Sequence, residues 1–233
     1  MSREPKAILF DMDGTILDWQ SGMEECWLAA CEAFCDGSYE PASLHEAIRA
    51  RRTWFWDDAE RARIGRLDLD EASRTIVRLA FADAALRDVA LAERIADDYR
   101  ALRWSAMAPY PGAIEALEAL RSRGMPLALL TNGGAASQRR SIERFGLARY
   151  FDCIVVEGEF GCGKPDERVF RHALSAVRCD AEAAWMVGDS LEADIAPAVA
   201  LGMHAVWVCA ADADAAAGDV RPHRVVRGIA ELL

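Results

Sequence analysis

The chain lacks the features that mark exported or membrane-spanning proteins. No stretch approaches the roughly 18 consecutive apolar residues of a membrane span. The polar N-terminus is followed by an apolar run, Ala7 to Phe10, which is far too short for a signal-peptide core. We therefore expect a soluble protein of the cytoplasm that has no membrane partner.

Paired metal-binding cysteines are also missing. The seven cysteines are odd in number and include no C-x-x-C pair, a usage typical of reduced cysteines in a packed core. Cys31 and Cys35 could share one helical face, but structural zinc takes four such ligands and no second pair of Cys or His completes a site.

Positive charge is scarce. The sequence has 27 Lys and Arg against 38 Asp and Glu, a formal net charge of -11. This charge repels polyanions, so a nucleic-acid polymer is not an expected partner. An anionic small molecule would need a local binding device, and a bound cation is the obvious candidate because it inverts the electrostatics of an acidic pocket.

What the chain has is a series of short apolar runs of strand length, separated by helical stretches. Continuous runs suit strands that are buried on both faces of a parallel sheet. Strand and helix in regular alternation predict an α/β fold with a Rossmann-like, doubly wound parallel sheet. The runs are Ala7 to Phe10, Leu127 to Leu130, Cys153 to Val156, Ala184 to Val187 and Ala205 to Val208.

Residues 18–108 interrupt this alternation. They contain no convincing strand, and apolar positions such as Ile95, Tyr99 and Leu102 recur at helical spacing. We expect an inserted all-helical cap of about four helices at 18–108, and an α/β catalytic core formed by 1–17 and 109–233. The alanine- and aspartate-rich stretch 210–218 predicts a mobile loop.

The predicted strands end in polar residues, and ligands of open α/β sheets bind beyond the carboxyl ends of the strands. Each short sequence has an ordinary reading as a turn or a helix start. Independent turns, however, need not place an acid pair, a hydroxyl, a lysine and a third acid at strand ends in this order. The residues are Asp11-Met12-Asp13-Gly14-Thr15, Thr131-Asn132-Gly133-Gly134, Gly163-Lys164-Pro165-Asp166, and Gly188-Asp189-Ser190 with Asp194.

Phosphoryl transfer through a carboxylate uses such a set. In this hypothesis Asp11 is the nucleophile, and Mg²⁺ held by Asp11 and Asp189 overcomes the repulsion between carboxylate and phosphate. Thr131 and Lys164 would bind the remaining phosphoryl oxygens. Asp13 would protonate the departing alkoxide and later accept a proton from the attacking water.

At these residues the sequence resembles the haloacid dehalogenase (HAD) superfamily, in its phosphatase branch with a helical cap. The resemblance implies Asp11 and Asp13 as catalytic residues, and Mg²⁺ bound by the Asp11 carboxylate, the Asp13 main-chain carbonyl and Asp189. It places Asp194 near the waters of the metal. It also implies a phosphate site made by the second and third motifs, namely Thr131, Asn132, Gly133 and Lys164.

The tract from Thr131 to Leu174 is similar to nucleotidases, acylneuraminate 9-phosphatases and phosphoglycolate phosphatases. The expected partner is therefore a small phosphorylated metabolite: a nucleotide, a sugar phosphate or phosphoglycolate. In this family the cap largely sets specificity, so the substrate stays open. In the cap, one of the aromatic residues Trp54 to Trp56 and one nearby arginine could bind the leaving group of the substrate. Alternatively, the aromatic residues form part of the cap core and the arginines form a solvated basic face.

Four alternatives compete with the phosphatase hypothesis. A 2-haloacid dehalogenase attacks through an aspartate at carbon, but it has no alkoxide to protonate, which leaves Asp13 without a task. A phosphomutase keeps the acid pair and stays open, and a non-catalytic binding protein leaves the filled catalytic positions unexplained. A P-loop nucleotide binder is disfavoured because Pro165 follows Lys164 and lacks both a hydroxyl and an N–H.

Overall fold

The computed structural model describes residues 4–209 and 219–233, so the loop expected at 210–218 lies outside the described residues. The chain divides into two compact units. One unit comprises Met1–Asp18 with Ala108–Leu233, and the other comprises Trp19–Met107. These boundaries lie one residue from the expected ones. That the helical unit acts as a cap in catalysis stays a prediction.

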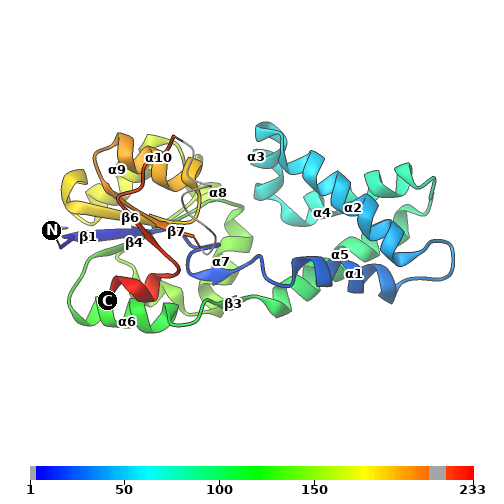
Figure 1. Ribbon diagram of the computed structural model, residues 1–233, viewed down its shortest axis with the longest axis horizontal. Coiled ribbons are helices and arrows are strands. Elements are labelled where there is room, and N and C mark those ends of the chain that lie inside the picture. The colour runs from blue at the N-terminus through cyan, green and yellow to red at the C-terminus, as the bar shows by residue number, and fades with distance from the viewer. Residues whose placement is uncertain (1–3, 210–218) are drawn as a thin grey trace. The chain divides into compact units, whose positions relative to one another are not determined.

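The first unit is built on a parallel sheet of six strands in the order β5-β4-β1-β6-β7-β8. Helices α9 and α10 cover one face and α6 covers the other (Figure 1). The predicted doubly wound α/β fold is confirmed. The strands are β1 (Ala7–Phe10), β4 (Leu127–Thr131), β5 (Cys153–Val156), β6 (Ala184–Gly188), β7 (His204–Val208) and β8 (Arg224–Val226). The helices of this unit are α6 (Ala113–Ser122), α7 (Ala135–Arg144), α8 (Glu157–Phe160), α9 (Glu167–Ala176) and α10 (Ala196–Ala200).

The central strands are continuous apolar runs because both of their faces are covered. All four residues of β1 are buried, and so are all five of β4. Strand β1 lies between β4 and β6, with Phe10 opposite Leu129 on one side and Val187 on the other. The three strands therefore end at the same edge, which fixes where the residues that follow them can lie.

Strand β8 and the segment after β6 depart from the sequence-based expectation. Strand β8 was not expected, because its three residues are only partly buried and form no apolar run. The helical stretch expected between the apolar runs of β6 and β7 is a π-helical turn, Leu191–Ile195, followed by the short α10. Pro197 stands at the start of α10 and cannot donate a main-chain hydrogen bond there.

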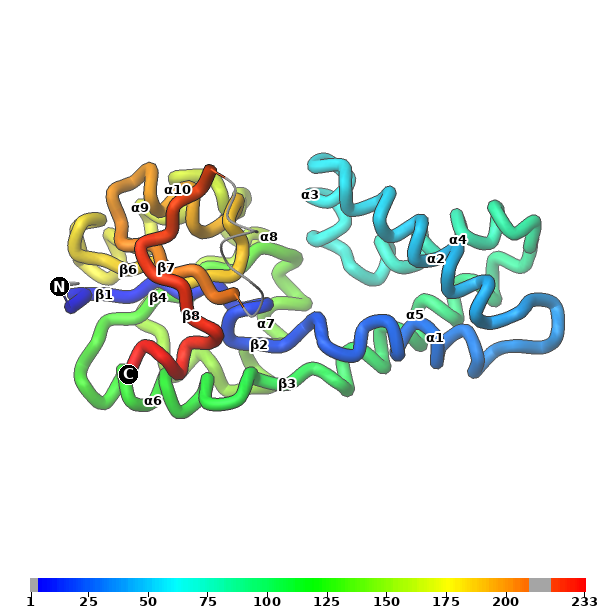
Figure 2. The backbone as a smooth tube through the Cα atoms, viewed as in Figure 1, coloured from blue at the N-terminus to red at the C-terminus, as the bar shows by residue number. Residues whose placement is uncertain are grey.

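A two-residue antiparallel ladder marks the place where the insert leaves and re-enters the first unit. Strand β2 (Leu17–Asp18) pairs with β3 (Ala108–Pro109), with Leu17 opposite Pro109 and Asp18 opposite Ala108. The tube in Figure 2 shows the two segments side by side. The main-chain N–H of Tyr110 also donates to Ile16 O at 2.9 Å.

The second unit contains five helices, not about four. Helix α3 is short, and only Asp57 and Asp58 separate it from α2, so the sequence suggests one element where there are two. In the core of the unit, the rings of Trp27 and Tyr99 stack with centroids 3.5 Å apart. Cys35 lies beyond the end of α1 and is exposed, so it does not share a helical face with the buried Cys31. The helices are α1 (Met23–Ala33), α2 (Pro41–Trp56), α3 (Ala59–Leu67), α4 (Leu69–Asp83) and α5 (Val89–Ala106).

The three consecutive aromatic residues at the end of α2 point in different directions, as helical geometry requires. Phe55 is buried, whereas Trp54 and Trp56 are 43% and 38% exposed. The Arg61 guanidinium lies 3.9 Å from the centroid of the Trp54 ring. Arg51 pairs with Asp83 within the same unit.

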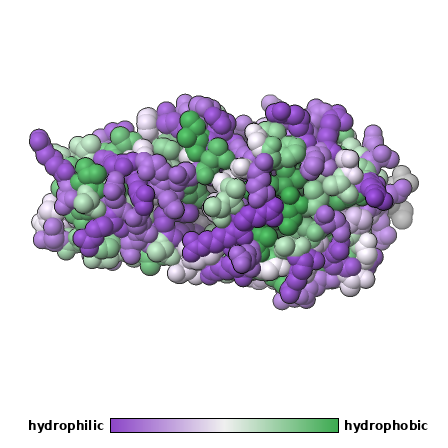
Figure 3. Space-filling view, turned by 180° about the vertical axis from the view of Figure 1, so that it is seen from behind, coloured by the Kyte–Doolittle hydropathy of each residue, from purple (hydrophilic) through white to green (hydrophobic). Residues whose placement is uncertain are grey.

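Hydrophilic side chains cover much of the face shown in Figure 3, with hydrophobic side chains between them. Across the described ranges, 4–209 and 219–233, no helix combines the length and the apolar character that crossing a membrane requires.

Candidate active site

The candidate site lies at the carboxyl edge of the sheet and begins with Asp11. Asp11 directly follows β1, is 6% exposed, and its main-chain N–H donates to Val187 O on β6 at 2.9 Å. This bond extends the pairing of β1 with β6 by one residue and holds the Asp11 main chain in place. A carboxylate buried to this degree requires a partner, because the loss of hydration disfavours its charged form.

Lys164 supplies that partner. Its Nζ lies 2.6 Å from Asp11 Oδ1 and 2.6 Å from Asp194 Oδ1, and the residue is 3% exposed. Burial alone lowers the pKa of Lys164, but the two carboxylates outweigh burial and hold this pKa above its usual value. The ammonium group is therefore a fixed positive charge beside Asp11. The other oxygen, Asp11 Oδ2, is buried and has no hydrogen-bond partner within the described part of the chain.

Asp189 completes the carboxylate cluster from the end of β6. Gly14 makes room for it: a Cβ at Gly14 would lie 2.2 Å from Asp189 Oδ2, and the φ of Gly14 is +90°. Both the contact and the backbone conformation therefore require glycine at this position. The residues that follow β1 and β6 meet here without an intervening side chain.

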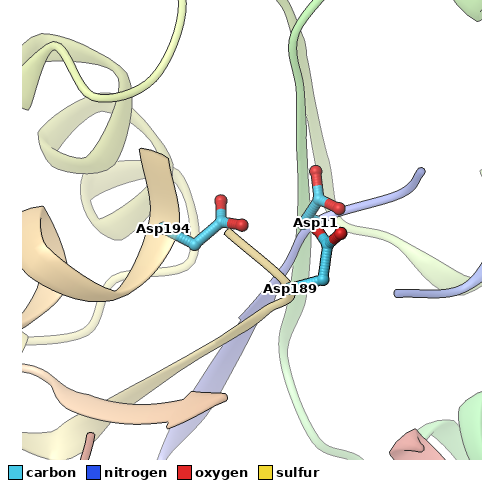
Figure 4. Close-up of side chains that lie close together, drawn as sticks. All are labelled: Asp11, Asp189 and Asp194. Atoms are coloured by element: carbon cyan, nitrogen blue, oxygen red, sulfur yellow. The ribbon is translucent and has the colours of Figure 1, made fainter. Parts of the chain in front are cut away.

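The carboxylates of Asp11, Asp189 and Asp194 offer oxygen atoms that all lie within 4.8 Å of one another. Figure 4 shows the three side chains gathered just beyond the strand ends. Burial, and next the negative charge of Asp11, raise the pKa of Asp189. Clustered carboxylates with an unpartnered buried oxygen are a donor set that a hard divalent cation such as Mg²⁺ fits. The three carboxylates are therefore chemically suited to bind a magnesium ion.

Asp13 is half-buried and is held from the start of α7. Gln138 Nε2 donates to Asp13 Oδ2 at 2.9 Å and to Asn132 O at 2.5 Å. Burial, followed by the charge of Asp11, raises the pKa of Asp13 to about 6 in spite of the Gln138 hydrogen bond. A carboxyl group with this pKa can both give and accept a proton near neutral pH.

The last residue of β4, Thr131, and the loop that follows it, with Asn132 and Gly133, lie at the same edge. Thr131 Oγ1 is buried and has no hydrogen-bond partner among residues 4–209 and 219–233. The Asn132 side chain bonds the Lys164 main chain reciprocally: Asn132 Nδ2 donates to Lys164 O at 2.7 Å, and Lys164 N–H donates to Asn132 Oδ1 at 2.8 Å. The Gly133 N–H donates to Glu157 Oε2 at 2.9 Å.

The structure thus brings Asp11, Lys164, Asp189 and Asp194 into direct proximity. Their roles, like those of Asp13, Thr131, Asn132 and Gly133, stay predictions. Asp194 ion-pairs with Lys164, a contact that the sequence hypothesis did not include.

Sequence reasoning gave no role to two buried residues that the structure places at this edge, Gln138 and Glu157. The signal for Gln138 was weak: a polar residue in the first turn of a helix that starts at the site. Glu157 directly follows β5, and that position at a strand end was its signal.

Comparisons with known proteins identify relatives of this chain. The chain is 27% identical over 212 residues to the glyceraldehyde 3-phosphate phosphatase of Methanocaldococcus jannaschii, covering 87% of this chain and 84% of that protein. It is 46% identical over 99 residues to the phosphoserine phosphatase of Thermus thermophilus, covering 42% of this chain and 40% of that protein. This chain thus spans less than half of the second relative but most of the first.

The fold is also found in a solved structure. A HAD-family hydrolase from Bacillus subtilis, crystallised with magnesium, matches with a TM-score of 0.74 and 24% identity, covering 99% of this chain and 97% of that one. The model of the haloacid dehalogenase-like hydrolase family matches residues 5–202, a range that includes the whole carboxylate cluster. The chain belongs to the haloacid dehalogenase-like hydrolases.

Proposed function

We propose that this hydrolase is a Mg²⁺-dependent phosphatase that removes the phosphoryl group from a small phosphorylated metabolite through an aspartyl-phosphate intermediate. One observation carries the proposal: the carboxylates of Asp11, Asp189 and Asp194 lie within 4.8 Å of one another beside a buried Lys164. Such a site attracts a divalent cation and then a phosphate dianion, although the whole chain is acidic.

In this proposal Asp11 attacks phosphorus and Asp13 moves the proton. The P–O bond to the leaving group breaks as a bond forms between an Asp11 carboxylate oxygen and phosphorus, and Asp13 gives its proton to the departing oxygen. Water then attacks phosphorus, Asp13 accepts a proton from that water, and inorganic phosphate leaves Asp11. Asp13 thereby returns to its starting protonation state.

The other site residues bind and orient. Lys164 supplies a fixed positive charge and Thr131 a free hydroxyl, which suit the phosphoryl oxygens. Asn132 and Gly133 are proposed to line the same phosphate site. Asp189, Asp11 and the Asp13 main-chain carbonyl would hold Mg²⁺, which supplies charge neutralisation between carboxylate and phosphate. Asp194 keeps Lys164 in place through its ion pair.

The names of two relatives support the proposed substrate class. Glyceraldehyde 3-phosphate and phosphoserine are substrates named for two relatives of this chain. Together with nucleotides, sugar phosphates and phosphoglycolate they define the panel to be tested. All are phosphomonoesters of small, polar alcohols.

The test is phosphate release from this panel with Mg²⁺ by the wild type and Asp11→Asn. We expect kcat to fall by roughly 10³-fold or more in the variant, because an amide does not attack phosphorus. The matched control is Asp180→Asn, an exposed acid that precedes β6 at the opposite end of the sheet. Unchanged turnover in purified Asp11→Asn would contradict the proposal.

Two further outcomes separate the alternatives. A phosphomutase would convert a sugar phosphate into its isomer without stoichiometric phosphate release. A dehalogenase would release halide from 2-haloacids without Mg²⁺ and leave the phosphate panel untouched. Either result would replace the proposed function.

A further inference from the structure

Gln138 is a buried amide whose donors both point at oxygen atoms of the candidate site. It lies in the first turn of α7, is 6% exposed, and reaches Asp13, which follows a different strand. A buried amide is costly unless it is hydrogen-bonded, so its partners indicate what it does.

The orientation of the Gln138 amide is determined by its surroundings. Nε2 lies 2.5 Å from Asn132 O, a main-chain carbonyl that can only accept a hydrogen bond. The amide nitrogen must therefore face Asn132 O, and the same NH₂ group places its second hydrogen toward Asp13 Oδ2 at 2.9 Å. Asp13 Oδ2 is thus an acceptor in this contact.

The glycine next to Asn132 makes this contact sterically possible. A Cβ on Gly133 would lie 2.7 Å from Gln138 Nε2, and the φ of Gly133 is +131°. A side chain at Gly133 would push the amide away from both of its acceptors. The main chain in the loop after β4 therefore leaves room for the Gln138 amide.

We propose that Gln138 is a positioning residue for the proton-transfer step: it binds Asp13 Oδ2 and leaves Asp13 Oδ1 as the oxygen that gives and accepts the proton. The inference rests on the proposed function, because it assigns a task to the same site. When the ester P–O bond breaks, the proton passes from Asp13 Oδ1 to the leaving oxygen; in the second step the proton of the attacking water passes to Oδ1.

The test uses two leaving groups. A poor leaving group, such as the alkoxide of an alkyl phosphate, depends on protonation, whereas p-nitrophenolate leaves readily without it. We would compare kcat/KM for both substrates in the wild type and in Gln138→Met, which keeps the length of the side chain and removes both donors. kcat/KM includes the step in which the leaving group departs.

We expect kcat/KM for the alkyl phosphate to fall about ten- to a hundredfold in Gln138→Met, as part of the effect of a general acid, and kcat/KM for p-nitrophenyl phosphate to fall less than about threefold. The ratio of the two values is independent of how much protein is folded, since loss of active protein lowers both equally. The control is Ser137→Ala on the same helix, whose hydroxyl donates to Gly134 O. We expect this variant to keep the wild-type ratio.

An equal fall for both substrates, or no fall for either, overturns the positioning role. A second variant, Gln138→Ala, must change the ratio in the same direction. Failure of the underlying function would look different: wild-type protein would hydrolyse neither ester, or Asp11→Asn would hydrolyse both at the wild-type rate.

Discussion

Because Gly14 has no side chain, the Asp189 carboxylate can lie beside Asp11 in the cluster. The φ of Gly14 is +90°, and an added Cβ would lie 2.2 Å from Asp189 Oδ2. The chain also offers a position with the same backbone requirement and no neighbour, Gly124, where φ is +73° and no heavy atom lies within 4 Å of an added Cβ. Substituting each glycine by alanine therefore distinguishes the effect of backbone strain, which both variants share, from the effect of a steric clash, which only the Gly14 variant has.

We expect Gly14→Ala to lower the free energy of unfolding by about 1–3 kcal/mol and to abolish most phosphatase activity, because Asp189 must move. Gly124→Ala should cost only about 1 kcal/mol of strain and keep the wild-type kcat. Urea denaturation and phosphate release measure the two effects. Equal activity in both variants would show that the Asp189 position does not matter.

For individual residues, the sequence predicted which side chains lie together at the site but not which of them contact one another. Asp11, Lys164 and Asp189 were identifiable because parallel strands end at one edge, so their place in the order of elements was enough. The contact from Gln138 to Asp13 joins residues 125 positions apart. Such a contact depends on the direction in which a side chain leaves its helix. That direction cannot be derived from the spacing of residues in a single sequence.

The loop after β4 and the loop after α8 are joined by the reciprocal pair of hydrogen bonds between the Asn132 amide and the Lys164 main chain. Asn132 was expected to bind substrate, and that role stays a prediction. The two bonds give it a second task, since they fix the segment that carries Lys164 beside Asp11. These partly buried hydrogen bonds contribute by fixing geometry as well as by their energy.

We expect Asn132→Ala to lower kcat/KM about tenfold or more and the free energy of unfolding by about 1–3 kcal/mol, because the N–H and C=O of Lys164 lose their partners. Asn132→Asp should fail as well, since a carboxylate cannot donate to Lys164 O. The control is Ser122, an exposed residue of α6 whose hydroxyl donates to Ala119 O within the same helix. Ser122→Ala should leave both quantities nearly unchanged, and a null effect of Asn132→Ala would contradict the positioning task.

Among the elements, long apolar runs were predictable and short or partly exposed ones were not. The central strands were identified because burial on both faces leaves an unbroken apolar run. Strand β8 has one buried residue of three, so it leaves no such run. Helix α3 follows α2 after only two residues, which hides the boundary between them.

At the scale of the whole molecule, binding of a cation to the folded state only should stabilise the protein. At a Mg²⁺ concentration about ten times Kd the gain is about 1.4 kcal/mol, which corresponds to a rise in Tm of about 3–6 °C for a chain of this size. We expect this rise in thermal unfolding of the wild type, with no substrate present. The measurement needs no catalytic activity.

The variant Asp189→Asn should lose the Mg²⁺-dependent rise. Because burial and the charge of Asp11 raise the pKa of Asp189, the ionised group is disfavoured in the metal-free fold. The neutral variant should therefore unfold at or above the wild-type temperature without Mg²⁺. Asp180→Asn is the matched control and should keep the rise. A full rise in Asp189→Asn would exclude this residue as a ligand.

The ladder between β2 and β3 has an evolutionary consequence. Leu17 opposite Pro109 and Asp18 opposite Ala108 bring the two ends of the insert together at a single point. A segment that starts and finishes at neighbouring positions can be exchanged for another of different length without rethreading the sheet. A different helical unit could thus be inserted between β2 and β3 while the strands and the acidic edge of the sheet stay unchanged.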